Sequence, residues 1–192
     1  DEGKLFAPFL PLLGGPAGMI VTDAVRFNMM FTFNPDAAPT LTSADILNSA
    51  YLPVATPSTG YNAKTALLAS LFTTASRNNV LNTLKTQQAN VWFYRFDWAN
   101  EPAPWNEVYG AAHAFDLPFI FGNFGPSLFS NAVNSTANRP GRLALSNAMM
   151  ATVGAFIRNG DPNNAGLGVS WPAWPETLSV NASNSAAQIS VQ

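Results

Sequence analysis

The sequence predicts an α/β fold, and three observations lead to that prediction. Residues 91–98, Val-Trp-Phe-Tyr-Arg-Phe-Asp-Trp, have the pattern of a β-strand whose apolar side chains fall on both faces, as in a parallel sheet. Helical patterns lie before this strand, at 64–72 and 79–88, and after it, at 140–158. A long segment with three prolines, 99–124, follows the strand, and α/β proteins place reactive groups in loops at that end of a parallel strand.

The first sixty residues predict loops and one short helix. Residues 1–15 lead as a loop into a turn at Gly14-Gly15-Pro16, and an apolar segment follows at 19–33. Thr42-Ser43-Ala44-Asp45 begins a short helix, with Thr42 or Ser43 as its N-cap. Two prolines and a glycine within 51–61 predict a loop.

The rest of the chain predicts three helices and few strands. The first two helices, 64–72 and 79–88, are separated by an expected break near 73–77. Pro140 fits the first position of the third helix, which Asn159-Gly160-Asp161-Pro162 ends. The other strand candidates are short: 119–121, 178–180 and 188–191. Because one buried strand does not make a sheet, strand 91–98 is expected to have neighbours from elsewhere.

The composition excludes several classes of protein. The 192 residues contain 9 Lys and Arg, 11 Asp and Glu and no Cys, so there is no basic field for nucleic acid and no thiolate chemistry. One His with scattered carboxylates lacks the spacing of a zinc site, and no glycine-rich phosphate loop is present, so we expect no metal or cofactor. Only 10% of residues are charged. Either Asn, Ser and Thr solvate the surface, or much of the chain is interior to something larger.

The start of the chain does not have the pattern of a secretory signal. The apolar stretch 5–13 is broken by Pro8 and Pro11, and no apolar run is long enough to span a bilayer. We expect a soluble protein that is secreted or periplasmic, with any signal peptide removed or upstream of Asp1.

His113 is the single histidine of the chain and the first candidate for catalysis. Small residues precede it, Asp116 follows three positions later, and all lie in the predicted loop after the buried strand. Such a histidine is more often a surface residue or a hydrogen-bonded core residue, so this spacing alone leaves both interpretations open.

Three segments together form a more specific pattern. Residues 110–121, GAAHAFDLPFIF, contain Gly-x-x-His-x-x-Asp-Leu and lead into Phe121-Gly122. The strand FYRFDW at 93–98 and the helix end AFIRNGDPN at 155–163, followed by Trp171-Pro172, complete the pattern. In order and spacing these motifs resemble type B carboxylesterases, the α/β-hydrolase branch that includes para-nitrobenzyl esterases and cholinesterases. The resemblance implies that residues 1–192 are the C-terminal part of one α/β-hydrolase domain, which completes its sheet with an N-terminal portion not in this chain.

The resemblance also implies a Ser-His-Glu triad for ester hydrolysis. Asp1-Glu2-Gly3 matches the family's acid motif, so Glu2 is the implied acid and His113 the implied base, separated by 113 − 2 = 111 residues. Taken alone, this tripeptide is a solvated chain start. The Gly-x-Ser-x-Gly elbow of the nucleophile does not occur in the sequence. We therefore expect the Ser and the oxyanion hole on a missing N-terminal segment or partner chain, a small ester as substrate, and no activity of this chain alone.

Asp116 and several aromatic residues are further candidates for roles in the site. Asp116 matches the family's acid after the histidine and would support the loop, although a helix N-cap or a solvated carboxylate is an equal alternative. Aromatic residues are candidates for an acyl or alcohol pocket, against the ordinary alternative of core packing: Phe6, Phe9, Phe27, Phe31, Phe121 and Phe124. Two alternatives to an esterase remain open, a non-catalytic binding protein of cholinesterase-like fold and an inactive fragment.

Overall fold

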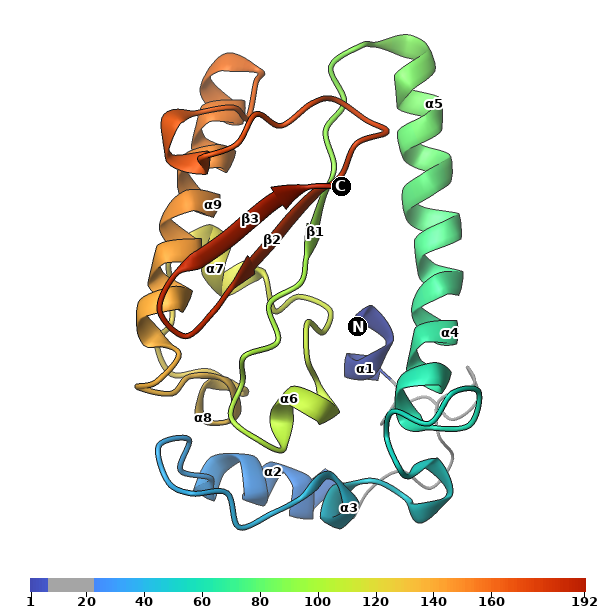
Figure 1. Ribbon diagram of the computed structural model, residues 1–192, viewed down its shortest axis with the longest axis vertical. Coiled ribbons are helices and arrows are strands. Elements are labelled where there is room, and N and C mark those ends of the chain that lie inside the picture. The colour runs from blue at the N-terminus through green and yellow to red at the C-terminus, as the bar shows by residue number, and fades with distance from the viewer. Residues whose placement is uncertain (7–22) are drawn as a thin grey trace. The chain divides into compact units, whose positions relative to one another are not determined.

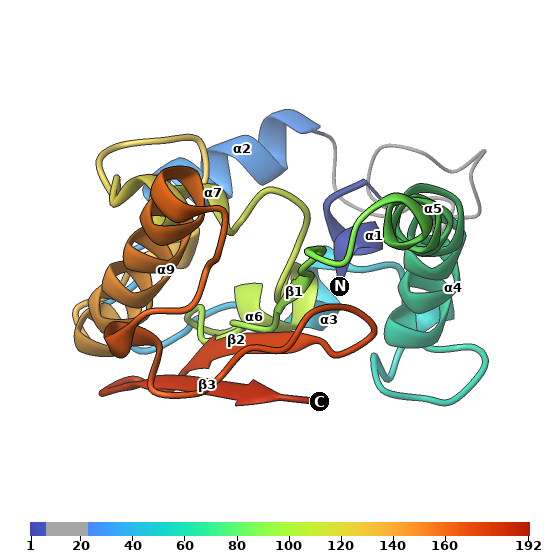
Figure 2. The same cartoon turned by 90° about the horizontal axis from the view of Figure 1, so that it is seen from above.

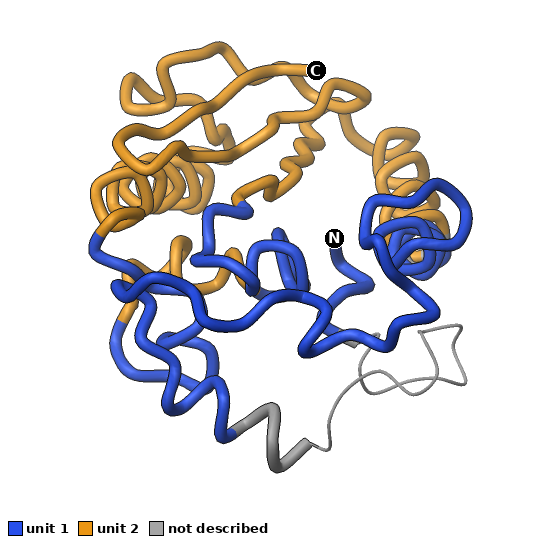
Figure 3. Tube along the Cα trace, turned by 60° about the horizontal axis from the view of Figure 1, so that its bottom comes forward, with its two compact units in different colours: residues 1–72, 99–114, 125–136 blue, residues 73–98, 115–124, 137–192 orange. Residues whose placement is uncertain are grey.

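The computed structural model describes residues 1–6 and 23–192. The expected turn at Gly14-Gly15-Pro16 and the pocket candidate Phe9 lie outside the described residues, as do the side chains of Phe6 and Phe27. The chain forms two compact units, each built from separate stretches of sequence (Figure 3). Unit 1 comprises Asp1–Phe72, Ala99–Ala114 and Gly125–Thr136; unit 2 comprises Thr73–Trp98, Phe115–Phe124 and Ala137–Gln192.

Unit 1 is helical in the residues that the structure describes. Its elements are α1 (Glu2–Phe6), α2 (Asp23–Thr32), α3 (Ser43–Ile46), the 3₁₀ turn η2 (Ser49–Tyr51), most of α4 (Tyr61–Thr73), α6 (Trp105–Val108) and α8 (Ser130–Val133). The predicted start of α3 is confirmed: Thr42 is its N-cap, and the Asp45 carboxylate accepts hydrogen bonds from the backbone N–H and the hydroxyl of Thr42 at 2.7 and 2.8 Å.

Aromatic side chains form the core of unit 1. The rings of Trp105 and Tyr109 stack at 5.6 Å, and Phe33 and Phe129 meet them edge-on. Trp105, Tyr109 and Tyr61 are almost completely buried. Such rings bury large areas and prefer these offset or edge-to-face arrangements, so they hold α6 and the segment after it firmly.

Unit 2 contains a three-stranded sheet in the order β1-β2-β3 (Figure 1). Strand β1 (Tyr94–Phe96) is parallel to β2 (Leu178–Ala182), which is antiparallel to β3 (Ala187–Val191). The parallel pairing of the predicted strand and the two C-terminal strands are confirmed. The expectation that this strand takes its neighbours from elsewhere is wrong for one edge, because β2 of the same chain pairs with it. The expected length of the first strand is wrong, because regular pairing with β2 is confined to Tyr94–Phe96. Before this strand, Phe93 and Val91 accept isolated hydrogen bonds from the N–H groups of Leu178 and Trp174.

Helix α9 (Arg139–Asn159) packs along the sheet against β2 and β3 (Figure 2). Both predicted ends are confirmed: proline lies in its first turn, and Gly160 ends it in the left-handed conformation at φ +71°. Near its start the Gly141 N–H donates to the Asn184 carbonyl at 2.9 Å, and a Cβ at Gly141 would overlap the Ser183 carbonyl oxygen. Glycine is therefore required where the β2–β3 turn meets the helix.

The remaining elements of unit 2 include two departures from the sequence-based expectations. The break expected near 73–77 is wrong, since a π-helical turn, η3 (Thr74–Asn78), continues into α5 (Asn79–Gln87). The strand expected at 119–121 is also wrong, because these residues belong to α7 (Leu117–Phe121), which has Pro118 in its first turn and a left-handed Gly122 at its end. A 3₁₀ turn, η4 (Ala165–Leu167), follows α9.

Candidate active site

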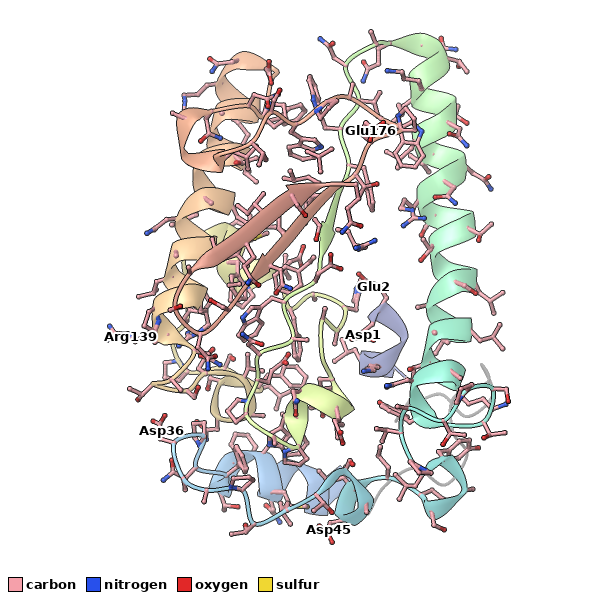
Figure 4. All side chains as sticks on the ribbon, viewed as in Figure 1. Asp1, Glu2, Asp36, Asp45, Arg139 and Glu176 are labelled. Carbon is pink, nitrogen blue, oxygen red and sulfur yellow. The ribbon has the colours of Figure 1, made fainter. Side chains whose placement is uncertain are left out.

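The acid candidate Glu2 lies on the short helix α1, next to Asp1 (Figure 4). The Lys4 N–H donates to the Asp1 carbonyl at 2.8 Å and closes this turn. A Cβ at Gly3 would meet the Thr65 carbonyl oxygen of α4 at 2.5 Å, so α1 approaches α4 as closely as only a glycine allows. The Asp-Glu-Gly sequence thus places Glu2 on a turn packed against a longer helix, with its side chain about half exposed.

The base candidate His113 lies between two residues in the left-handed backbone region. Gly110 has φ +52° and Ala114 has φ +65°. An alanine in this conformation costs roughly 1 kcal/mol, so the surrounding packing has to maintain it. One such anchor is Tyr61 of α4, whose buried hydroxyl donates to the Val108 carbonyl at 2.7 Å. The histidine is therefore presented on a constrained segment.

The structure brings Glu2 and His113 together. Their Oε2 and Nδ1 atoms are 2.7 Å apart, although 111 residues separate them in the chain, and both belong to unit 1. A carboxylate only accepts hydrogen bonds, so this contact requires the proton on Nδ1 and leaves Nε2 as the ring nitrogen that can take up a proton. The His113 side chain is 53% exposed, and the Glu2 side chain is 52% exposed.

This arrangement can act as an oriented general base. A histidine whose Nδ1–H is held by a carboxylate can accept a proton at Nε2, and the carboxylate stabilises the imidazolium that forms. The Gly-x-Ser-x-Gly elbow that is typical of a serine nucleophile does not occur in the 192 residues. Among the described residues no cluster of three His, Cys, Asp or Glu side chains could hold a metal ion.

Asp116 lies in unit 2, at the N-cap position of α7. Its side chain makes no capping hydrogen bond, and its Oδ2 instead accepts a hydrogen bond from the Tyr94 hydroxyl of β1 at 2.6 Å. This contact ties the start of α7 to the sheet. Sequence reasoning did not anticipate the partner, because residues 94 and 116 share no local motif.

Two buried charged residues of unit 1 were missed by the sequence analysis, Lys4 and Glu101. They are 4% and 5% exposed. Burial lowers the pKa of Lys4 below its ordinary value and raises the pKa of Glu101 well above its ordinary value, while each group's charge opposes the other's shift. Among the described residues neither carboxyl oxygen of Glu101 has a hydrogen-bond partner. The only available sequence signal was the position of Lys4, two residues after Glu2 in a chain with few charges.

The pocket candidates with described side chains belong to different units. Phe31 in unit 1 is 59% exposed, and Phe121 in unit 2 is 73% exposed. Phe124 packs edge-on against Phe119 with its ring centroid 5.1 Å away, beneath the Arg142 guanidinium. Their role in a pocket stays a prediction. None of the described helices combines the length and apolar character that crossing a membrane requires.

Comparisons with known proteins identify a family and several relatives of this chain. The model of the carboxylesterase family matches residues 23–190, a range that includes His113 and begins after Glu2. Para-nitrobenzyl esterase of Bacillus subtilis (strain 168) is 32% identical over 93 residues, which are 48% of this chain and 17% of that protein.

Two solved structures are similar in fold. A PNB esterase structure has a TM-score of 0.54 at 23% identity and covers 70% of this chain and 26% of its own. The Geobacillus stearothermophilus carboxylesterase EST55 at pH 6.2 has a TM-score of 0.50 at 29% identity and covers 74% and 28%. The chain thus spans less than a third of the length of these relatives. These likenesses show part of an α/β-hydrolase fold, and the resemblance noted in the sequence is confirmed: the chain belongs to the carboxylesterase family.

Proposed function

We propose that this chain supplies the acid and the base of a Ser-His-Glu triad that hydrolyses carboxylic esters. Glu2 is the acid and His113 is the base. The observation that carries the proposal is the 2.7 Å contact between Glu2 Oε2 and His113 Nδ1 across 111 residues of sequence. Membership of the carboxylesterase family supports the same chemistry.

In the proposed reaction, proton transfer passes through His113. Nε2 takes the proton from a serine hydroxyl as the serine oxygen attacks the ester carbonyl, and it then gives that proton to the departing alcohol. Water attacks the acyl-enzyme in the second half of the cycle with the same assistance. Glu2 keeps the imidazole in the required tautomer and offsets its positive charge in both halves.

The serine and the oxyanion hole are proposed to come from a polypeptide segment outside these 192 residues. The sequence has no nucleophile elbow, and the relatives are several times longer than the chain. The half-exposed side chains of Glu2 and His113 are compatible with access by such a segment. On this proposal the chain is the C-terminal part of one α/β-hydrolase domain, inactive alone, in a secreted or periplasmic enzyme. Fractionation of the producing cells tests the location.

Asp116 has a supporting role in this proposal. Its hydrogen bond to the Tyr94 hydroxyl fixes the start of α7, three residues after His113, to strand β1. The expected contribution is to the position of the chain that follows the histidine, without contact with the ester.

The test uses the complete enzyme that contains this sequence. Hydrolysis of a short-chain p-nitrophenyl ester is measured for the wild type, His113→Ala and Glu2→Gln, with Glu176→Gln as the matched control because Glu176 is an exposed glutamate of unit 2. We expect kcat to fall about 10³- to 10⁴-fold for His113→Ala and at least about 10²-fold for Glu2→Gln, because triad members act as a unit. The control should hydrolyse the ester like the wild type.

A fluorophosphonate probe, which labels activated serines, tests the origin of the nucleophile. Peptide mapping should find the label outside residues 1–192, and His113→Ala should prevent labelling. A label on a serine within these residues would contradict the proposed division of the triad. If the complete wild-type enzyme neither hydrolyses the ester nor takes up the probe, the non-catalytic binding protein becomes the better interpretation.

A further inference from the structure

Lys4 is a buried lysine on the same short helix as the proposed catalytic acid. Its side chain is 6% exposed, and its ammonium lies 3.3 Å from Asp1 Oδ1 and 5.8 Å from the centroid of the Tyr61 ring. Burying an ammonium group is costly unless the charge has partners. The contacts of the ammonium with Asp1 and Tyr61 compensate this cost, so they identify the segments that Lys4 connects.

Both partners of the ammonium group also contact the segment that carries His113. The other carboxylate oxygen of Asp1, Oδ2, occupies the space that a side chain at Gly110 would fill. Tyr61, whose ring lies beside the ammonium, donates its hydroxyl hydrogen bond to the Val108 carbonyl. Lys4 thus joins the acid-bearing helix to two points just before the histidine.

Two glutamates favour the charged form of this lysine. Glu101 and Glu107 both act on Lys4 electrostatically and oppose the effect of its burial. Glu101 is itself buried, whereas Glu107 is exposed. Asp1 is the acidic side chain in direct contact with the ammonium, and Glu101 and Glu107 favour its charge electrostatically.

We propose that Lys4 is a positioning residue that keeps Glu2 and His113 within hydrogen-bond distance. The proposal rests on the proposed function. The backbone of Lys4 belongs to the helix that carries Glu2, and the Lys4 ammonium contacts residues that in turn contact the segment before His113. Lys4 does not touch the reacting atoms. Loss of its charge should loosen α1 from the histidine segment and lengthen the contact between Oε2 and Nδ1.

The test compares variants of the complete enzyme. Lys4→Met removes the charge and keeps most of the side-chain length, and Lys4→Arg restores a charge. Lys64→Met is the matched control, because Lys64 is a partly exposed lysine of α4 with no ion pair to the described residues. Asp1→Asn removes the direct partner at a side chain that is 39% exposed, so it should fold even if Lys4→Met does not.

Two readouts are measured for each variant. Ester hydrolysis gives kcat and KM, and ¹⁵N NMR of labelled histidine gives the tautomer of the neutral His113 ring, with the resonance identified by its loss in His113→Gln. We expect Lys4→Met to lower kcat about 10- to 100-fold with KM unchanged within about twofold, and to shift the ring from the Nδ1–H toward the Nε2–H tautomer. Asp1→Asn should shift both readouts the same way, Lys4→Arg should recover most of the loss, and Lys64→Met should match the wild type.

The proposal is overturned if Lys4→Met and Asp1→Asn fold and keep the wild-type tautomer and kcat. It is also overturned if Lys4→Arg is as impaired as Lys4→Met, since charge would then not be the cause. The NMR readout does not depend on turnover. An enzyme that proves inactive toward esters but shows the tautomer shift would contradict the proposed function and support the positioning role.

Discussion

Replacing glycine by alanine should change the free energy of unfolding in opposite directions at two positions of α9, Gly154 and Gly141, because a tight backbone contact lies only at Gly141. A glycine inside a helix is ordinarily less stable than alanine by about 0.5–1 kcal/mol, so Gly→Ala is expected to stabilise. At Gly154 the nearest atom to a new Cβ is the Nη1 of Arg158, 3.0 Å away at the end of an exposed side chain that can move. Gly154→Ala should therefore gain a few tenths to about 1 kcal/mol in the free energy of unfolding.

Gly141→Ala should instead destabilise the protein. The new Cβ would overlap the Ser183 carbonyl oxygen, which is backbone of the β2–β3 turn, and the Gly141 N–H already bonds to the neighbouring Asn184 carbonyl. Overpacking of this kind costs about 1–3 kcal/mol, which exceeds the propensity gain and leaves a net loss of about 1–2 kcal/mol. For a chain of this size that corresponds to a decrease in Tm of about 2–8 °C.

Urea and thermal unfolding followed by circular dichroism measure both variants against the wild type. The matched pair removes effects of the substitution type, because the helix and the residue change are the same. If Gly141→Ala gains stability as Gly154→Ala is expected to, the close approach of the β2–β3 turn to α9 is refuted. An equal loss in both variants would refute the use of helix propensity at Gly154.

Three further predictions concern unit 1. Tyr61→Phe removes a buried hydrogen bond from the Val108 carbonyl and should lower the free energy of unfolding by about 1–3 kcal/mol in urea titrations; an unchanged midpoint would contradict the buried contact. Burial raises the pKa of Glu101, so the folded state holds this proton more tightly than the unfolded chain, and the associated stability is lost as pH rises from the ordinary carboxyl range through the raised pKa. Glu101→Gln cannot ionise, so its stability relative to the wild type should increase as the pH rises above the ordinary carboxyl range, and a pH-independent difference would contradict this. Gly110→Ala imposes φ +52° on alanine and displaces the Asp1 carboxylate, so its thermal midpoint should fall by the equivalent of about 1–2 kcal/mol; an unchanged midpoint would argue against the left-handed conformation.

The ends of a helix could be predicted from sequence where residues typical of helix starts and ends flank it. Pro140 and Gly160 correctly predicted both ends of α9, and Thr42 predicted the start of α3. The same kind of signal was overlooked at Pro118 and Gly122, which bracket the short helix α7. A three-residue apolar run is ambiguous between helix and strand, and the flanking proline and left-handed glycine decide in favour of the helix.

The candidate site could be predicted only as far as its motif extends. Asp-Glu-Gly and the histidine segment identified Glu2 and His113 through the family resemblance, and the structure places these two side chains in contact. Lys4 and Glu101 could not be predicted, because a charged side chain becomes buried only when distant segments fold around it. The hydrogen bond from Tyr94 to Asp116 likewise joins a strand to a helix start 22 residues later, and no local pattern encodes it.

The interleaved course of the chain through the two units has a consequence for folding. After Asp1–Phe72 the chain passes through unit 2 over Thr73–Trp98 before it returns to unit 1, and it makes a second such passage over Phe115–Phe124. Contacts between such distant stretches form slowly, because the entropy of closing the intervening loop is lost before they stabilise anything. No single cut in the chain releases either unit as one continuous fragment. The contact between Glu2 and His113 closes a loop of this kind, so during refolding it should form late and report that unit 1 is fully assembled.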